Sequence, residues 1–250
     1  MRDATRRAVV WEALRAVLAE RAAALGRETL DIVDAGGGTG GFAVPLASLG
    51  HVVTVVDPTP DSLAALERRA AETGVGVKGL QGDAADLGDL LEPGSADLVV
   101  CHSVLEYVED PAGALRAVAG ILRPGGVVSV LAANSVAAAV HRSLAGHFDE
   151  ARQALSDPAG RWGDRDPTPR RFSREALAAL LGTAGFAVGE VHGVRIFADL
   201  VPGMLAESDP DGLVALERAA ATHPVLRDIA TQIHVIAYRE QTRMGADGRE

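Results

Sequence analysis

The residues Asp31-Ile32-Val33-Asp34-Ala35-Gly36-Gly37-Gly38-Thr39-Gly40-Gly41 decide how the rest of this chain is interpreted. A short apolar run contains an acid near its end, and a glycine-rich turn follows it directly. Glycine lets the backbone turn sharply and lets a ligand lie against bare peptide groups. A strand, such a turn and a helix behind it form the usual seat of a nucleotide-like cofactor at the carboxyl edge of a parallel sheet.

The composition sets limits on the class of protein. The 250 residues suit one large domain, and an apolar content of 48% is enough for a sizeable core. The net charge of −10 argues against a chain that coats nucleic acid. Cys101 is the single cysteine, so no intrachain disulfide can form and we expect a cytoplasmic protein. No run is long and apolar enough to cross a bilayer, so we expect no membrane partner.

The apolar pattern predicts an α/β fold. A helix is expected over residues 8–24, and strands are expected over 31–35, 52–57, 76–82, 97–102 and 126–131, with helices between them. Strands that alternate with helices in this way require a parallel sheet with right-handed crossovers. The prediction is therefore a Rossmann-like, doubly wound sheet.

This alternation is interrupted between residues 135 and 171. One helical stretch is expected over about 136–155, followed by a loop rich in Asp, Gly, Pro and Arg. The pattern resumes with a helix over 173–184, a strand over 186–197, a helix over 212–221 and a final strand over 233–238. We expect a single domain over 1–240, with an N-terminal helical lid (1–30), a helical cap insertion near the acceptor (135–172) and a mobile tail (241–250). Whether residues 1–30 close over a cofactor or pack on the sheet stays open.

The glycine turn fits two cofactor motifs. Gly36, Gly38 and Gly41 satisfy the dinucleotide pattern G-x-G-x-x-G, with Asp57 about 20 residues on, where a ribose-binding acid is expected. Gly36, Gly38 and Gly40 satisfy instead the closely similar turn G-x-G-x-G of enzymes that use S-adenosylmethionine (SAM). An NAD-dependent oxidoreductase, or a SAM- or nucleotide-binding module without catalysis, is therefore an alternative to a SAM enzyme.

Three further stretches resemble the class I SAM-dependent methyltransferases. Asp34 stands two residues before Gly36, the segment Gly82-Asp83-Ala84 matches a turn after the third strand, and residues 96–111 followed by Leu122-Arg123-Pro124-Gly125-Gly126 match the fourth and fifth strand signatures. The resemblance covers almost the whole chain. It implies a seven-stranded, mostly parallel sheet whose last strand is antiparallel, with SAM as the cofactor. No metal site is expected, because His141 and His147 lie six residues apart and do not share a helix face.

The resemblance also implies roles for individual residues. Asp34 and the glycine turn that follows it would hold the methionine portion of SAM. The residues of this turn are Gly36, Gly38, Thr39 and Gly40. Asp57 would bind the ribose hydroxyls, Asp83 with Ala84 would contact the adenine, and His102 would face the sulfonium. The residues themselves leave alternatives open. Asp57 and Asp83 could cap helices, and His102 could be a packed imidazole; Glu106 and Glu109 are expected only to cap and solvate a helix.

Outside the cofactor half the chain is similar to the bacterial tRNA 5-carboxymethoxyuridine methyltransferases, which methylate a carboxylate on the wobble uridine. The residues that carry this resemblance are Arg6, Trp11, Asn134 and the segments 144–149 and 193–200. It implies that Arg6 reaches the SAM carboxylate and that Arg195 lies at the acceptor end of the site. Arg195, Asn134 and His102 are therefore the candidates for positioning the acceptor, although Arg195 could simply pair with Asp199.

The acceptor region departs from that family. Residues 156–166 are mixed in charge where the family is basic, and Ala132 and Ala133 replace aromatics. Both changes weaken the phosphate contacts and base stacking that hold RNA. The remaining basic and aromatic residues of the segment could form an anion-binding rim or merely a solvated loop: Arg161, Trp162, Arg165, Arg170 and Arg171. We expect a methyltransferase acting on a carboxylate or hydroxyl oxygen, of tRNA or alternatively of a small molecule or sugar.

Overall fold

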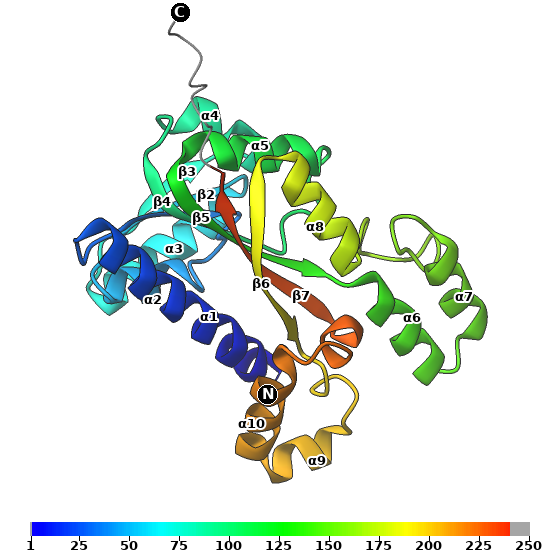
Figure 1. Ribbon diagram of the computed structural model, residues 1–250. Helices are drawn as coiled ribbons and strands as arrows, with labels where there is room; N and C mark the ends of the chain where they lie inside the picture. The colour runs from blue at the N-terminus through cyan, green and yellow to red at the C-terminus, as the bar shows by residue number, and fades with distance from the viewer. Residues whose placement is uncertain (1, 241–250) are drawn as a thin grey trace, which may run out of the picture.

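A single mixed sheet forms the centre of the molecule (Figure 1). The computed structural model describes residues 2–240, with side chains from residue 8 onward, and within them seven strands lie in the order β3-β2-β1-β4-β5-β7-β6. The strands are β1 (Asp31–Ala35), β2 (Val52–Asp57), β3 (Lys78–Gln81), β4 (Ala96–His102), β5 (Leu122–Ala133), β6 (Phe186–Val194) and β7 (Gln232–Arg239). β1 to β5 are parallel, and β7 runs antiparallel between β5 and β6. The predicted fold, with its antiparallel last strand, is confirmed.

Helices cover both faces of this sheet (Figure 1). One face packs against α1 (Arg2–Leu25), α2 (Ala43–Ser48) and α3 (Pro60–Thr73), and the other against α4 (Leu87–Leu90), α5 (Pro111–Ile121) and α8 (Arg174–Thr183). Within β1 the side chain of Ile32 joins the first layer, whereas Val33 and Ala35 join the second. Every residue of β4 is buried, as expected for a parallel strand covered on both sides.

The first helix packs on the sheet through residues 9–18. Val10, Leu14 and Val17 are buried in the same apolar layer as Ile32 and Leu98. α1 also contacts α10 (Pro210–Ala221). The described side chains of α1 thus pack against the sheet, and the lid expected over residues 1–30 stays a prediction. The tail expected over residues 241–250 lies outside the described part of the chain.

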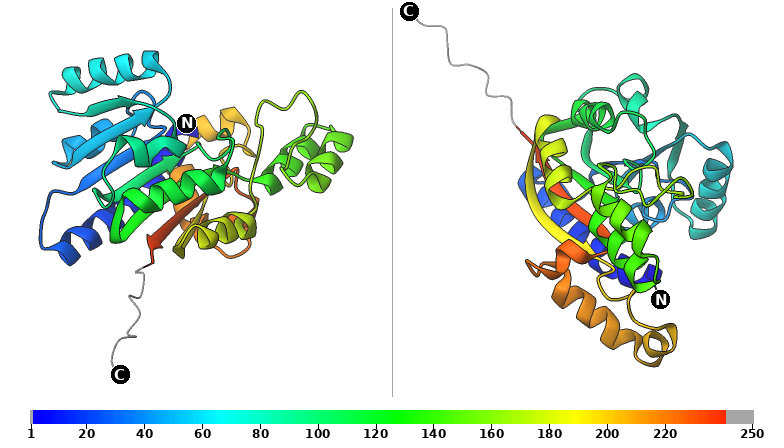
Figure 2. Two further views of the ribbon diagram at one scale, coloured as in Figure 1. Left: turned by 90° about the horizontal axis from the view of Figure 1, so that it is seen from above. Right: turned by 90° about the vertical axis from the view of Figure 1, so that its right-hand side faces the viewer.

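The interruption after β5 is a pair of helices and a long loop. α6 (Ser135–Leu144) and α7 (Phe148–Ser156) project from the body (Figure 2), and the loop 157–171 leads back to the sheet. The prediction of one helix over 136–155 is wrong, because Gly146 adopts a left-handed conformation with φ +78° between the two helices. The expected strand over 186–197 also ends earlier, at Val194, because Arg195 has a φ of +61°.

Several short elements were not predicted from the sequence. They are the 3-10 helices η1 (Ala84–Asp86) and η2 (Leu226–Ile229), α4 and α9 (Gly203–Ser208). All are too short for a periodic apolar pattern to identify. Among residues 2–240, no helix combines the length and the apolar character that crossing a membrane requires.

Candidate cofactor and acceptor sites

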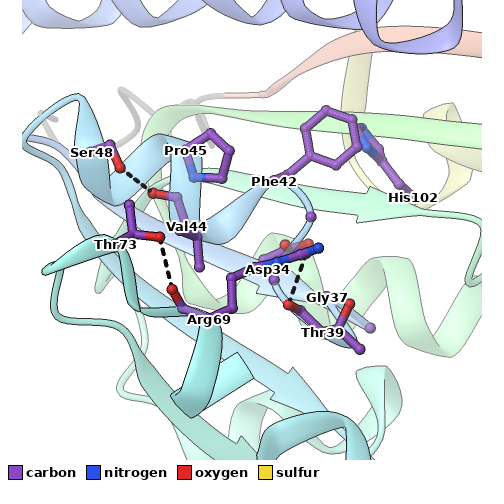
Figure 3. A pocket seen from close by; sticks show the side chains of 13 residues that line it. Asp34, Gly37, Thr39, Phe42, Val44, Pro45, Ser48, Arg69, Thr73 and His102 are labelled. Atoms are coloured by element: carbon purple, nitrogen blue, oxygen red, sulfur yellow. Dashed lines mark hydrogen bonds between the residues drawn. The ribbon is translucent and has the colours of Figure 1, made fainter. Parts of the chain in front are cut away.

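A cavity of about 760 Å³ lies at the carboxyl ends of β1 and β4; we call it the first pocket (Figure 3). Its walls are the glycine turn after β1, the beginning of α2, the ring of His102 and the side chains of Arg69 and Thr73 from α3. The strand ends meet here because β1, β2 and β4 are parallel, which is the position where open α/β sheets bind their ligands.

The backbone of the turn distinguishes the two glycine motifs. Gly36, Gly38 and Gly40 have φ values of +71°, +53° and +80°, which other residues rarely adopt. A Cβ atom on Gly36 would overlap Val104, and one on Gly40 would overlap Leu66. Gly41 has an ordinary φ, and a Cβ atom added there would meet nothing within 4 Å. The conformation therefore requires glycine at G-x-G-x-G and not at the third position of G-x-G-x-x-G.

Hydrogen bonds inside the protein already use part of this turn. The amide of Gly36 donates to the Val56 carbonyl at 2.7 Å, and the amide of Gly40 donates to the Gly37 carbonyl at 3.0 Å. The amide of Gly38 donates to Asp57 Oδ2 at 2.9 Å. Contacts from the backbone amides to a ligand would then come from Gly37 and Thr39, and the predicted contacts of the turn with the methionine portion stay a prediction.

Asp34 forms the acidic floor of the first pocket. The residue is 3% exposed, lies directly against Gly37, and accepts a hydrogen bond from the Ala43 amide at the start of α2. Burial, together with the nearby charge of Asp57, raises the pKa of the Asp34 carboxyl from 3.8 to about 7, and the Ala43 amide lowers it only in part. A cation next to Asp34 would relieve this cost, whereas a pyrophosphate would increase it. The pocket therefore fits the positively charged SAM better than a dinucleotide.

The acids at the ends of β2 and β3 both bind backbone amides. Asp57 Oδ1 accepts from the amide of Thr59 at 2.9 Å, in addition to its bond to Gly38. Asp57 thus ties the glycine turn to the start of α3, and a ribose contact would use its remaining lone pairs. Asp83 caps η1 by accepting from the Ala85 amide at 3.1 Å, as the alternative interpretation proposed. The Ala84 side chain is buried in the core, so only its backbone could contact adenine.

His102 belongs to a buried polar row that crosses three strands. Its Nε2 lies 2.8 Å from Ser129 Oγ on β5, and the same oxygen lies 2.8 Å from His234 Nε2 on β7. The His234 ring in turn stacks on His192 of β6, with ring centroids 5.5 Å apart. Burial is the main reason that the pKa of His234 is well below its ordinary value. His102 is therefore both a wall of the first pocket and a partner in this row.

Aromatic rings connect α1 to the same pocket. Trp11 stacks on Phe42 with ring centroids 5.4 Å apart, and the rings of Phe42 and His102 meet at nearly a right angle with centroids 4.7 Å apart. Phe42 and His102 lie side by side in the pocket wall (Figure 3). Arg6, predicted to reach the SAM carboxylate, lies outside the residues whose side chains the structure describes.

A second, smaller cavity of about 270 Å³ lies beside Ser103, the residue that follows β4; we call it the second pocket. Ser103, Asn134, Arg195 and Gln232 line it from the sheet, and His141, Arg142 and Trp162 line it from α6 and the loop 157–171. Gln232 donates to the Ser103 hydroxyl at 3.3 Å. Because His102 lines the first pocket and Ser103 the second, the two pockets are neighbours at this strand end.

Glu106 is a pocket residue that the sequence interpretation missed. It is 2% exposed, lines the second pocket, and its Oε1 accepts from the Ala133 amide at 2.7 Å. The expectation that Glu106 solvates a helix is therefore wrong; only Glu109 is exposed. The interpretation failed because Ala133, its hydrogen-bond donor, is 27 residues away and β5 alone brings the two together.

The two predicted acceptor residues of this region differ in how they are engaged. Asn134 is buried, donates to the carbonyls of Asp228 and Ala230 at 2.9 and 2.8 Å, and caps α6 by accepting from Val136. It therefore shapes the second pocket with its amide already in use. Arg195 Nη2 pairs with Asp199 Oδ2 at 2.5 Å, the pairing named as the alternative, while the side chain also lines the second pocket.

The arginines that could form an anion-binding rim are engaged within the protein. Arg171 forms two hydrogen bonds to Asp166, at 2.6 and 2.9 Å, and Arg170 donates to the carbonyls of Leu105 and Val108. Arg161 pairs with Asp157, and Arg165 lies 3.8 Å from Glu150. Trp162 carries the Arg142 guanidinium 3.8 Å above its ring. Binding of phosphates here would have to compete with these contacts.

Side chains suited to metal binding do not gather in the described part of the chain. Within residues 2–240 no group of three or more His, Cys, Asp or Glu side chains could hold a metal ion. Cys101 is buried, and burial raises the pKa of its thiol to about 12, so it does not supply a reactive thiolate.

Comparisons with known proteins identify the family of this chain. The model of a methyltransferase domain family matches residues 33–130, the part from β1 to β5. The chain is 31% identical over 241 residues to the tRNA 5-carboxymethoxyuridine methyltransferase of Escherichia coli K12, which covers 95% of this chain and 89% of that protein. It is 33% identical over 164 residues to a ubiquinone biosynthesis O-methyltransferase of Xanthomonas euvesicatoria, covering 65% of each.

The fold is also found among solved structures. A SAM-dependent methyltransferase from Mesorhizobium loti superposes with a TM-score of 0.60 at 24% identity, over 92% of this chain and 97% of that one. At this identity the likeness concerns the fold. The Escherichia coli relative, in contrast, matches the sequence over 95% of the chain.

Proposed function

We propose that this chain, which belongs to the class I SAM-dependent methyltransferases and within them to the family of the bacterial tRNA 5-carboxymethoxyuridine methyltransferases, methylates a carboxylate held in the second pocket. The first pocket holds SAM, which supplies a methyl group made electrophilic by the sulfonium. Among carboxylates, 5-carboxymethoxyuridine of tRNA is our first candidate, because the relative with that substrate in its name aligns over 95% of the chain.

One observation on Arg195 carries the proposal of a carboxylate. Its side chain lines the second pocket and is 23% exposed, although Nη2 is paired with Asp199. The accessible part of the guanidinium can therefore donate to a ligand in that pocket. A guanidinium presents several N–H donors in one plane, which suits the two oxygens of a carboxylate. Arg195 can therefore bind an anion without giving up Asp199.

The reaction asks little of this chain beyond positioning. A carboxylate is already a nucleophile, so no side chain has to remove a proton, and alignment of the two reactants supplies much of the rate. Asp34 favours a cation in the first pocket, and Arg195 favours an anion in the second. His102 and Ser103, which are consecutive, separate the two pockets by a single peptide at the end of β4.

The first test is transfer of a labelled methyl group from SAM to tRNA bearing unmethylated 5-carboxymethoxyuridine. Replacing Arg195 by alanine removes a charged hydrogen bond worth about 1.5–3 kcal/mol, so kcat/KM for the acceptor should fall by about tenfold or more. Arg152, an exposed arginine of α7, provides the matched control, and Arg152→Ala should leave kcat/KM unchanged. Equal effects of the two substitutions would remove Arg195 from the site.

The product identifies the atom that is methylated. A methyl ester releases its label as methanol in mild alkali, whereas a methyl ether is stable. Labelled tRNA that loses its label in alkali would support a carboxylate acceptor. Alkali-stable label would contradict it and point to a hydroxyl oxygen.

A small-molecule hydroxyl is the second candidate, and two observations favour it. Glu106 lines the second pocket and is a carboxylate that could accept a proton from a hydroxyl acceptor. The arginines of the loop 157–171 are held by acids and carbonyls of the protein, which reduces their value for phosphate binding. Absence of transfer to tRNA, with transfer to a fraction of small metabolites, would decide for this candidate.

A further inference from the structure

We propose that Glu217 of α10 is a positioning residue for Arg195, and through it for the acceptor; this rests on the proposed role of Arg195. Glu217 is fully buried, although it lies on a helix that neither pocket touches. A buried carboxylate is costly unless it is fully hydrogen-bonded, so its partners indicate what it is there to hold.

The carboxylate of Glu217 accepts three hydrogen bonds from consecutive backbone amides. Oε2 accepts from Ile196 at 2.9 Å, and Oε1 accepts from Phe197 at 2.8 Å and from Ala198 at 2.7 Å. Charged hydrogen bonds of this length are among the strong ones in proteins. Together they fix the direction of three successive peptide groups in the turn that follows β6.

This turn begins at Arg195, whose backbone is left-handed with a φ of +61°. A residue with a Cβ atom is disfavoured in that conformation and adopts it only when its surroundings hold it there. Glu217 supplies the restraint on the side of α10. On the side of β7, the Thr231 amide donates to the Arg195 carbonyl at 3.2 Å, and the Thr231 hydroxyl donates to Asp199 at 2.7 Å.

The consequence concerns the direction of the guanidinium. The Arg195 side chain leaves the backbone at the residue where the chain direction changes, and it reaches the wall of the second pocket from there. If the amides of residues 196–198 lose their acceptor, Arg195 can relax to an ordinary negative φ. Its guanidinium then moves away from the second pocket. Glu217 thus acts on the acceptor site from α10, without contact with either ligand.

The test is a double-mutant cycle between Glu217→Gln and Arg195→Ala, assayed with SAM and tRNA bearing 5-carboxymethoxyuridine. Glutamine keeps the shape but turns an NH2 group toward amide donors, so kcat/KM for the acceptor should fall by about tenfold while the Kd for SAM changes by less than about twofold. In the Arg195→Ala background, Glu217→Gln should lower kcat/KM by less than about twofold further, because coupled residues are not additive. Glu207→Gln, on the exposed face of α9, is the matched control.

The outcomes separate the two proposals. If Arg195→Ala lowers kcat/KM but Glu217→Gln does not, or if the losses of the two variants add fully, the positioning role is wrong and the proposed function stands. If Arg195→Ala has no effect, Arg195 is not part of the acceptor site and the positioning role is wrong with it, whereas methyl transfer to tRNA tests the proposed function by itself. Should Glu217→Gln fail to fold, Glu217→Asp keeps the charge and withdraws it by one methylene group. We expect that variant to lower kcat/KM only where Arg195 is present, and an unchanged kcat/KM in the otherwise native chain would overturn the inference.

Discussion

At the scale of single residues, the glycine turn shows how backbone conformation selects between similar motifs. Gly40 is required by its φ of +80° and by the proximity of Leu66, whereas Gly41 is not required by either. The acid before the turn and the glycine spacing therefore point to the same cofactor. The sequence of the turn matches both motifs, because it gives the residue types but not the backbone φ of each glycine.

The first prediction concerns this difference between neighbouring glycines. Gly40→Ala would place a Cβ in a left-handed conformation, which costs about 1–2 kcal/mol, and against Leu66 as well. We expect the affinity for SAM to fall by about tenfold or more, measured by calorimetry. Gly41→Ala is the matched control and should bind SAM like the unchanged protein. Loss of binding in Gly41→Ala with normal binding in Gly40→Ala would contradict the assignment of the turn to G-x-G-x-G.

At the scale of the elements, the polar row formed by His102, Ser129 and His234 joins β4, β5 and β7 inside the sheet's apolar layer. The serine hydroxyl has one proton, so it can donate to only one of the two imidazoles and must accept from the other. The two rings are thus coupled in their tautomers. His102 cannot change its hydrogen bonding at the first pocket without a response from His234.

The second prediction follows from the bridging position of Ser129. Ser129→Ala would leave two buried imidazole nitrogens without their partner, and each unsatisfied buried group costs about 1–3 kcal/mol. We expect the free energy of unfolding in urea to fall by about that amount or more. Ser143→Ala, on the exposed side of α6, should change it by less than about 0.5 kcal/mol. Equal stabilities of the two variants would show that the row is not maintained in solution.

The comparison of sequence with structure is most informative at this scale. The strands 31–35 and 52–57 were predicted with the bounds that the structure has, because runs of β-branched residues buried on both faces leave a clear signal. The helix over 136–155 was predicted wrongly, because Gly146 was taken as a helical residue although a left-handed glycine commonly ends a helix. The roles of Glu106, Ser129 and Glu217 were missed because their partners lie 19 to 105 residues away. Asp34, Gly36, Thr39, Gly40 and His102 line the first pocket, whereas Gly38, Asp57, Asp83 and Ala84 are not among its lining residues, so their contacts with a cofactor stay a prediction. The acceptor region depends on contacts that spacing does not reveal.

At the scale of the whole molecule, buried titratable groups make the free energy of unfolding depend on pH in opposite directions. The pKa values of His234 and His192 are lowered, mainly by burial. Below pH 6.5 the two histidines become protonated in the unfolded state but stay neutral in the folded state. Their contribution to the stability of the fold is therefore lost as the pH falls below that value.

The pKa of Asp34 is raised to about 7, so the folded state keeps a proton that the unfolded state has released above pH 3.8. Its contribution therefore favours the folded state at low pH and is lost as pH rises from about 4 to 7.

The last prediction uses Asp34→Asn to separate ligand binding from folding. Asparagine can still accept from the Ala43 amide but cannot ionise, so the variant should be more stable than the unchanged protein above pH 7, by an amount on the order of a few kcal/mol that vanishes toward pH 4. Urea unfolding at several pH values measures this difference. Binding should show the reverse. The unchanged protein should gain affinity for SAM as pH rises through about 7, because the ionised carboxylate attracts the cation, and the gain should be absent in Asp34→Asn.

Calorimetry in buffers of different ionisation enthalpy provides the internal control for this prediction, since SAM binding at about pH 7 should release protons from the unchanged protein and fewer from the variant. A variant that binds SAM with undiminished affinity at about pH 8, where the native carboxyl is ionised, would remove Asp34 from the site, whatever its stability. If the stability and the binding measurements both give the expected result, Asp34 limits the stability of the fold at neutral pH. Its ionised form then becomes favourable only when a cation occupies the first pocket.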